Sequence, residues 1–174
     1  MALRQVEAVD AIHWLQERSI TQGEAYIASL PDISEFPGYS LSEWKDWFEQ
    51  TAELILSKTH PDSVTVFYQS DIKIDGKWID KGFLVQKAAE RVHSHLLWHK
   101  IICRVSPGEA TFGRPSYSRI LCFSKKLSCD VSKSTPDVIP SMGIKTWERG
   151  MGPMACMMIA KFIKDQTECH SIVH

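Results

Sequence analysis

Residues 26–36 read YIASLPDISEF, and this stretch decides the fold. A short apolar run over 26–30 stops at Pro31. Short apolar runs bounded by breakers are typical of buried strands, and open α/β sheets bind ligands just beyond the carboxyl ends of parallel strands. We therefore expect a functional edge here, and the polar side chains crowded at it are Ser29, Asp32, Ser34 and Glu35.

The rest of the chain alternates strand and helix patterns. Residues 40–43 have the S-x-x-E form of a capping box, and an apolar stripe behind them predicts a helix to about Lys58. Asp10 and Asp80 are candidate N-caps of two further helices, and Pro153 stands at a favourable first-turn position of the last one. The first expected strand ends at Ser29, and further strands are expected over 63–72, 96–103, 118–124 and 170–174. The connections include a turn at 74–78, a glycine- and proline-rich loop at 107–115 and a polar linker at 125–142.

This order of elements predicts a single domain of the α/β class, a three-layer sandwich. A chain of 174 residues is long enough to bury most of its apolar surface in one core. The strands at 96–103 and 118–124 are expected to pair in antiparallel fashion around the loop between them.

Composition bounds the function classes. The hydrophobic content of 44% and charged content of 24% are those of an ordinary globular protein. The net charge of −1 gives no overall basic field, so any nucleic-acid contact must come from a local patch. Five cysteines without a CxxC pair predict reduced thiols, and we expect a cytoplasmic protein because no signal peptide or membrane-length apolar run is recognisable.

Several catalytic or metal patterns are not present in the sequence. His93, His95, His99 and Cys103 match no common zinc spacing, and residues alternating along a strand would not converge, so we expect no metal site. No G-x-S-x-G elbow and no G-x-x-x-x-G-K-[ST] loop occurs, which disfavours a serine hydrolase and a P-loop nucleotidase.

The order of elements resembles a known family. A strand ending in SLPD, a helix, a strand, a helix, a strand with a WHK run, a hairpin, and a final helix and strand are similar to the permuted Rossmann-like amino-methyltransferases. These enzymes use S-adenosylmethionine to methylate adenine N6 or cytosine N4. The motif of the family is Asp, Asn or Ser followed by Pro-Pro and an aromatic residue. Here Ser29 and Pro31 are kept, whereas Leu30 replaces the first proline and Asp32 the aromatic residue.

The resemblance implies a catalytic role for Ser29, Pro31 and Asp32. The Ser29 side chain and the Leu30 carbonyl would accept the hydrogens of an exocyclic amine and align its lone pair, and Asp32 would act as acceptor or general base. The alternative is that Ser29 and Asp32 only cap a strand-to-loop turn.

For the cofactor, the resemblance implies binding by Ser29, Arg149, Gly150 and Gly152. Glycines at a helix start can present N–H groups to the methionine carboxylate, although a plain capping role remains open. In the family a glycine-rich cofactor loop follows the last strand, and this chain ends where that loop should begin. We therefore expect residues 1–174 to form one methyltransferase-like domain, either as part of a longer protein or with half of the cofactor pocket missing.

For the substrate, aromatic and basic side chains near strand ends suit a stacked base and its phosphates. The candidates are Tyr68, Gln69, Arg104, Arg114 and Tyr117, of which Tyr68 also fits a core position.

The sequence thus predicts an S-adenosylmethionine-dependent methyltransferase acting on a nucleic-acid base. RNA is favoured over DNA because the segment around 125–142 is too short for a large target-recognition region. A homo-oligomer or a partner subunit is possible, given the near-neutral charge. Two alternatives stay open: a non-catalytic methyltransferase-like interaction subunit, and a methyltransferase for a small molecule or protein.

Overall fold

Within residues 4–145, 147 and 150–174, the part of the chain that this computed structural model describes, the strands form a six-stranded sheet and a separate two-stranded hairpin. The strands are β1 (Glu24–Ala28), β2 (Thr65–Gln69), β3 (Ile72–Ile74), β4 (Lys77–Ile79), β5 (His95–Cys103), β6 (Tyr117–Ser124), β7 (Val138–Ile139) and β8 (Ser171–Val173). The helices are α1 (Ala11–Glu17), α2 (Leu41–Lys58), α3 (Lys81–Arg91) and α4 (Pro153–Gln166), with 3₁₀ turns at Ile33–Glu35 and Val131–Lys133.

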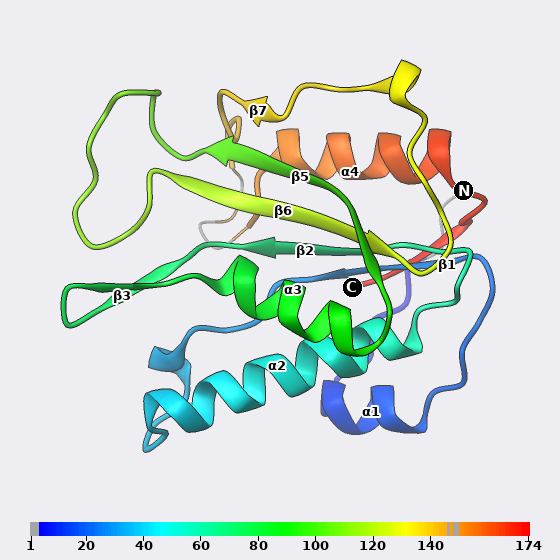
Figure 1. Cartoon of the computed structure of the whole chain (residues 1–174), viewed down its shortest axis with the longest axis horizontal. Helices are drawn as coiled ribbons and strands as arrows, with labels where there is room; N and C mark the ends of the chain where they lie inside the picture. The colour runs from blue at the N-terminus through cyan, green and yellow to red at the C-terminus, as the bar shows by residue number, and fades with distance from the viewer. Residues whose placement is uncertain (1–3, 146, 148–149) are drawn as a thin grey trace.

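The strand order in the larger sheet is β7-β5-β6-β2-β1-β8. β1 is parallel to β2 and to β8, and β5 is parallel to β7, whereas β6 is antiparallel to both of its neighbours, β2 and β5. The predicted class, a Rossmann-like sandwich whose mostly parallel sheet contains an antiparallel hairpin, is confirmed. Since β1 and β2 run side by side, the chain after each strand emerges at the same edge of the sheet (Figure 1).

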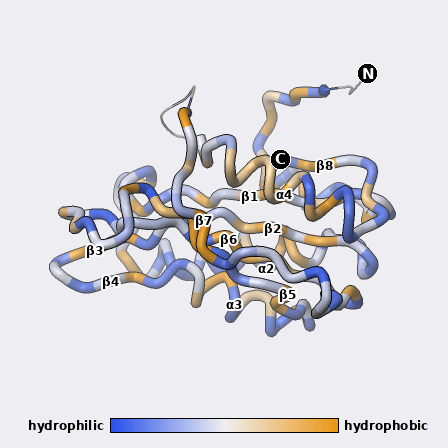
Figure 2. The backbone as a smooth tube through the Cα atoms, turned by 90° about the horizontal axis from the view of Figure 1, so that it is seen from above, coloured by the Kyte–Doolittle hydropathy of each residue, from blue (hydrophilic) through white to orange (hydrophobic). Residues whose placement is uncertain are grey.

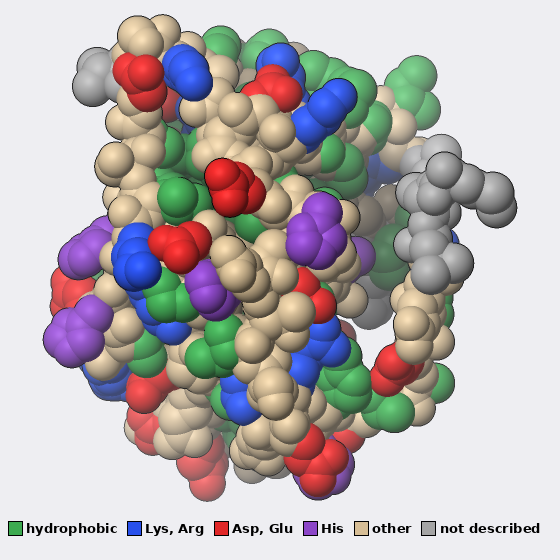
Figure 3. Space-filling model, turned by 90° about the vertical axis from the view of Figure 1, so that its right-hand side faces the viewer, with side chains coloured by type: hydrophobic (Ala, Val, Ile, Leu, Met, Phe, Trp, Pro, Cys, Tyr) green, Lys and Arg blue, Asp and Glu red, His purple; other side chains and the backbone are tan. Residues whose placement is uncertain are grey.

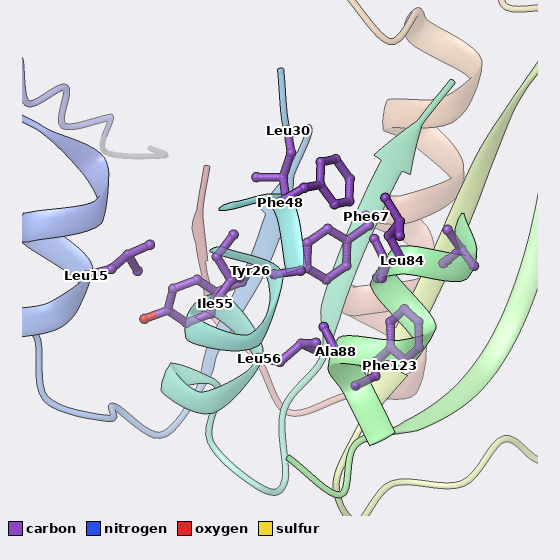
Figure 4. Close-up of a cluster of buried hydrophobic side chains, with 14 of the residues drawn as sticks. Leu15, Tyr26, Leu30, Phe48, Ile55, Leu56, Phe67, Leu84, Ala88 and Phe123 are labelled. Atoms are coloured by element: carbon purple, nitrogen blue, oxygen red, sulfur yellow. The ribbon is translucent and has the colours of Figure 1, made fainter. Parts of the chain in front are cut away.

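Helices cover both faces of the sheet, which makes the three layers. α1, α2 and α3 lie on one face and α4 on the other (Figure 1). Figure 4 shows the core on the first face, where Phe67 and Phe123 from the sheet meet Phe48 of α2 and Leu84 of α3. The second core packs Ile159 and other residues of α4 against β1, β2, β5 and β6. Alternate residues of β2 serve the two cores, as a doubly covered strand requires.

The predicted helix starts are confirmed. The Ser40 Oγ accepts from the Glu43 N–H at 3.2 Å, and the Glu43 carboxylate accepts from the Ser40 N–H at 2.8 Å. Asp80 accepts from the Phe83 N–H at 2.8 Å, and Asp10 caps α1 in the same way. Each contact satisfies a backbone donor that a helix leaves unpaired in its first turn.

Two expectations about strands are wrong. The strand expected over 63–72 ends at Gln69, and residues 72–79 form the β3–β4 hairpin, whose turn at Asp75 and Gly76 has positive φ at both positions. The expected linker at 125–142 contains β7, which is held beside β5 by the Lys100 ammonium: this group donates to two carbonyls and one carboxylate of residues 135–137.

The compartment expectations are tested only in part. The five cysteines form no disulfide. In the described ranges, none of the helices is both long and apolar enough to cross a bilayer.

Candidate functional site

The corner that follows β1 borders a cleft of about 310 Å³. Three segments meet there: the corner at 32–34, the chain from the end of β2 through β3, and the loop between β5 and β6. This is the edge where the parallel strands β1 and β2 end. The lining residues are Asp32, Ile33, Ser34, Ser70, Asp71, Ile72, Lys73, Ile74, Arg104, Gly113 and Arg114.

Lys81, the first residue of α3, holds the corner in place. Its Nζ donates to the Leu30 carbonyl at 3.1 Å and to the Asp32 carboxylate at 2.6 Å, and its side chain is 3% exposed. It also lies 5.4 Å from the centre of the Phe48 ring. Burial lowers the pKa of Lys81, and the nearby Asp32 carboxylate partly opposes that shift.

A second charged group lies beside Lys81. Asp71 accepts from the Lys81 N–H at 2.9 Å and pairs with the Arg119 guanidinium at 2.9 Å. Arg119 also donates to both oxygens of Asp80, at 2.8 and 2.9 Å. Burial raises the pKa of Asp71, opposed by Arg119. The guanidinium needs a glycine next to it, because a Cβ at Gly82 would lie 2.9 Å from its Nη1.

The predicted catalytic residues lie together at the end of β1. Ser29 is exposed, and no hydrogen bond joins its hydroxyl to another described residue. The Pro31 carbonyl accepts from the Trp44 indole N–H at 3.4 Å. Asp32 is not a free carboxylate, since Lys81 holds it.

The predicted cofactor residues do not all lie together: Ser29 follows β1, whereas Gly150 and Gly152 precede α4, at the same edge of the sheet but on its opposite face (Figure 1). Gly152 is the N-cap of α4 with φ +87°, and a Cβ there would lie 2.5 Å from the Met142 carbonyl oxygen. The Gly150 N–H donates to the Trp147 carbonyl at 3.0 Å. Arg149 lies outside the described residues.

The predicted substrate residues separate into two groups. Arg104 and Arg114 line the cleft. Tyr68 faces α4 in the second core, where burial raises its pKa and a hydrogen bond with Ser118 opposes the rise. Tyr117 does not line the cleft; the centre of its ring lies 6.0 Å from the Arg119 guanidinium carbon.

Gln69 is a special case at the end of β2. Its side chain is 1% exposed, and neither amide atom has a hydrogen-bond partner among the residues described. Such a group costs stability unless something satisfies it. Gln69 lies directly opposite Arg119 of β6 in the ladder, one residue before the cleft-lining Ser70.

Sequence reasoning missed Lys81, Arg119 and Lys73 as site residues. For Lys81 a signal was present: a cation in the first turn of a helix faces the positive end of the helix dipole, so a lysine directly after the Asp80 N-cap is unusual. Arg119 carried no such signal, because its partners Asp71 and Asp80 are distant in the chain.

No protein-family model and no curated protein sequence matches the chain. Solved structures do match. TTHA0409 of Thermus thermophilus, an inferred DNA modification methylase, is 12% identical with a TM-score of 0.60, over 91% of this chain and 72% of that one. The cytosine-N4-specific PvuII DNA methyltransferase is 14% identical with a TM-score of 0.57, over 87% of this chain and 61% of that one.

A third similar structure is the complex of M1.HpyAVI with S-adenosylmethionine, at 14% identity and a TM-score of 0.53. It is matched over 94% of this chain and 76% of that chain. At these identities the likeness shows the fold, which is the one expected from the order of elements.

Proposed function

We propose that this chain is an S-adenosylmethionine-dependent methyltransferase that acts on an exocyclic amine of a nucleic-acid base. The observation that carries the proposal is the exposed Ser29 at the carboxyl end of β1, three residues before Asp32, which lines a cleft together with Arg104 and Arg114. The fold is shared with a protein described as a DNA methyltransferase and with M1.HpyAVI, whose structure is a complex with S-adenosylmethionine.

The corner supplies two hydrogen-bond acceptors for the amine. Ser29 offers its hydroxyl oxygen, and the Leu30 carbonyl has a second lone pair beside the one that Lys81 uses. Pro31 restricts the backbone of Leu30, which fixes the direction of that carbonyl. Asp32 is bound to Lys81, so we assign it to holding the corner rather than to removing the proton.

S-adenosylmethionine would supply a methyl group activated by its sulfonium centre. The start of α4 fits its carboxylate only in small part: Gly152 has no side chain to cap the helix, but Pro153 has no N–H and the Met154 N–H donates to the Met142 carbonyl at 3.3 Å. This leaves the N–H of the buried Ala155 as the first-turn donor for an anion. Gly150 contributes less, since its N–H already donates to Trp147. Residues 1–174 remain our proposed single methyltransferase-like domain, with β8 as its cofactor-side strand.

The kind of nucleic acid is the finer part of the proposal. The described segment between β6 and α4 is short and partly committed to β7, which supports recognition without a large sequence-reading region and hence our preference for structured RNA. The similar structures are DNA enzymes by description, so RNA and DNA substrates belong in the same assay.

Methyl incorporation from labelled S-adenosylmethionine into RNA and DNA tests the proposal. Ser29→Ala is expected to reduce incorporation by at least about 100-fold, since one aligned acceptor is lost, while the thermal shift caused by the cofactor is retained. Ser42→Ala, an exposed serine on α2, is the matched control. A variant at Asp32 should be Asp32→Asn and not Asp32→Ala, because the asparagine side-chain oxygen can still accept a hydrogen bond from Lys81. Undiminished transfer by Ser29→Ala would remove this residue from the mechanism.

A non-catalytic methyltransferase-like subunit is the second candidate. The Lys81 bridge favours it, because this ammonium already engages Asp32 and the Leu30 carbonyl in a purely structural contact. Absence of any stabilisation by S-adenosylmethionine would support this candidate. Methylation of a small molecule or protein in place of a nucleic acid would support the third reading from the sequence.

A further inference from the structure

One face of the β3–β4 hairpin packs against the core, and the other face does not. Ile72 and Ile74 pack against the core on the α2 and α3 side, and Ile79 is 9% exposed. On the other face Lys73 and Trp78 lie directly opposite each other, with the Lys73 Nζ 5.6 Å from the centre of the Trp78 ring. Trp78 is nevertheless 54% exposed. A single exposed ring is common on proteins, so its surroundings decide what it means.

The surroundings are basic and not neutralised. Lys73 and Lys77 lie on the hairpin, and Arg104 and Arg114 lie on the loop between β5 and β6. In the described part of the chain, no carboxylate comes within ion-pair distance of these four cations. The acidic groups of the cleft itself, Asp32 and Asp71, are already paired with Lys81 and Arg119. The two segments contain two further carboxylates, Asp75 and Glu109.

The hairpin and the loop are two arms on either side of one cleft. Both project from the edge of the sheet where β2 ends (Figure 1), and the view from above shows β3 and β4 extending beyond the sheet (Figure 2). The loop arm carries its own exposed aromatic ring, Phe112, which is 99% exposed. Each arm therefore combines one exposed ring with two cations. The opposite edge of the sheet shows acidic, basic and histidine side chains interspersed (Figure 3).

We propose that the β3–β4 hairpin binds an unpaired segment of nucleic acid at the rim of the cleft, with a base stacked on Trp78, a neighbouring phosphate at Lys73 on the same face, and another at Lys77 beside the hairpin turn. An indole face can stack only on a base that has left its own stack, which selects single-stranded or flipped-out nucleotides over an intact duplex. The lysine side chains are flexible and can bind phosphates, with each ammonium acting as a point charge. This inference rests on the proposed function, because it describes how the same substrate is held.

Fluorescence anisotropy without S-adenosylmethionine tests the inference. The probes are labelled RNA and DNA strands of one mixed sequence, about 20 nucleotides long, and the DNA duplex of that sequence. Trp78→Ala is expected to weaken single-strand binding by about 5- to 100-fold, and Trp78→Phe to restore most of it. Lys73→Gln with Lys77→Gln should lower the slope of log K against log salt by about 1.4. The RNA and DNA arms distinguish the two sources of unpaired bases.

The matched control is Lys126→Gln with Lys164→Gln, which removes the same charge beyond β6 and in the last turn of α4, at the opposite edge of the sheet. It should leave the salt slope unchanged. Equal binding by wild type and hairpin variants, or tighter binding to the duplex than to either strand, would overturn the inference and leave the proposed function standing. A wild type that binds no nucleic acid overturns both. Loss of cofactor binding alone counts only against the proposed function. If Trp78→Ala does not fold, the phenylalanine and glutamine variants decide.

Discussion

The two faces of the sheet are built differently at the edge where β1 and β2 end. On the α2 and α3 face, ion pairs form around two buried groups: the Lys81 ammonium pairs with Asp32, and the Asp71 carboxylate pairs with Arg119, which also binds Asp80. On the α4 face the backbone itself approaches closely, with Gly152 against the Met142 carbonyl. Tyr68 and Ser118 are buried on this face, and the buried Lys100 ammonium pairs there with Asp137 of the segment that leads into β7. Ion pairs hold the corner after β1, whereas the start of α4 depends on a close backbone approach that a side chain at Gly152 would block.

Under the proposed function, the corner and the start of α4 would have separate tasks. Ion pairs between distant segments fix the corner in one geometry, which suits a group that must align an amine within a fraction of an ångström. At the start of α4 no side chain caps the helix, and under the proposed function the Ala155 N–H would be the first-turn donor for the cofactor carboxylate. Substitutions at the two sites should therefore lower the free energy of unfolding for different physical reasons.

The largest effect is expected from Arg119→Met. It leaves Asp71, which is 7% exposed, as an uncompensated buried carboxylate, and we expect a loss of about 3–5 kcal/mol in the free energy of unfolding by urea titration. Adding Asp71→Asn should recover part of this loss. Arg91→Met is the control, because its partner Glu49 keeps a second ion pair with Lys87. Equal losses in the two arginine variants would contradict a special role for the Arg119 pair.

The next effect in size is expected on the α4 face from Gly152→Ala. The positive φ and the contact with the Met142 carbonyl together should cost about 2–3 kcal/mol. Gly38→Ala is the control, since its φ is +89° but a Cβ there meets nothing within 4 Å, and only the conformational cost of about 1 kcal/mol is expected. The difference between the two losses of unfolding free energy measures the cost of the contact between the new Cβ and the Met142 carbonyl. If Gly152→Ala lost no more unfolding free energy than Gly38→Ala, α4 would have shifted away from the Met142 carbonyl to accommodate the new Cβ.

The smallest effect at neutral pH is expected from Lys81→Met. Replacing a buried lysine by an apolar side chain of similar length can be neutral, and Asp32 is 37% exposed and can be hydrated, so we expect a change within about 1 kcal/mol.

The pH dependence of this variant sharpens the test. The folded pKa of Lys81 lies below the value of 10.5 in the unfolded chain, so between these values the unfolded state binds more protons and the stability of the wild type rises with pH. The difference in unfolding free energy, wild type minus Lys81→Met, should therefore increase as the pH approaches about 10. A flat difference would show that burial does not perturb this ammonium.

Local signals in the sequence predicted most of the fold. The capping residues Ser40 and Asp80 set helix starts through contacts three residues away, and the apolar run before Ser29 marked β1. β7 was missed because it is two residues long and depends on Lys100, whose partners lie 35 to 37 residues further on. Apolar periodicity cannot register a strand of that length.

The candidate site was only partly predictable for the same reason. Ser29, Pro31 and Asp32 are adjacent in the sequence and were found together. Lys81 contacts this corner across 49 to 51 residues, so its role follows from tertiary packing and not from any local pattern. Tyr68 shows the converse: its residue type suits base stacking, but alternation along β2 turns it toward the α4 core.

The hairpin and the corner share a short covalent path. β4 ends at Ile79, Asp80 caps α3, and Lys81 follows with its ammonium on Asp32. Two residues, Ile79 and Asp80, thus separate Trp78 from Lys81, whose ammonium holds the corner after β1. A displacement of the hairpin would therefore reach the corner at 29–32 through Asp80 and Lys81, which would couple the proposed strand binding to the alignment of the proposed acceptor.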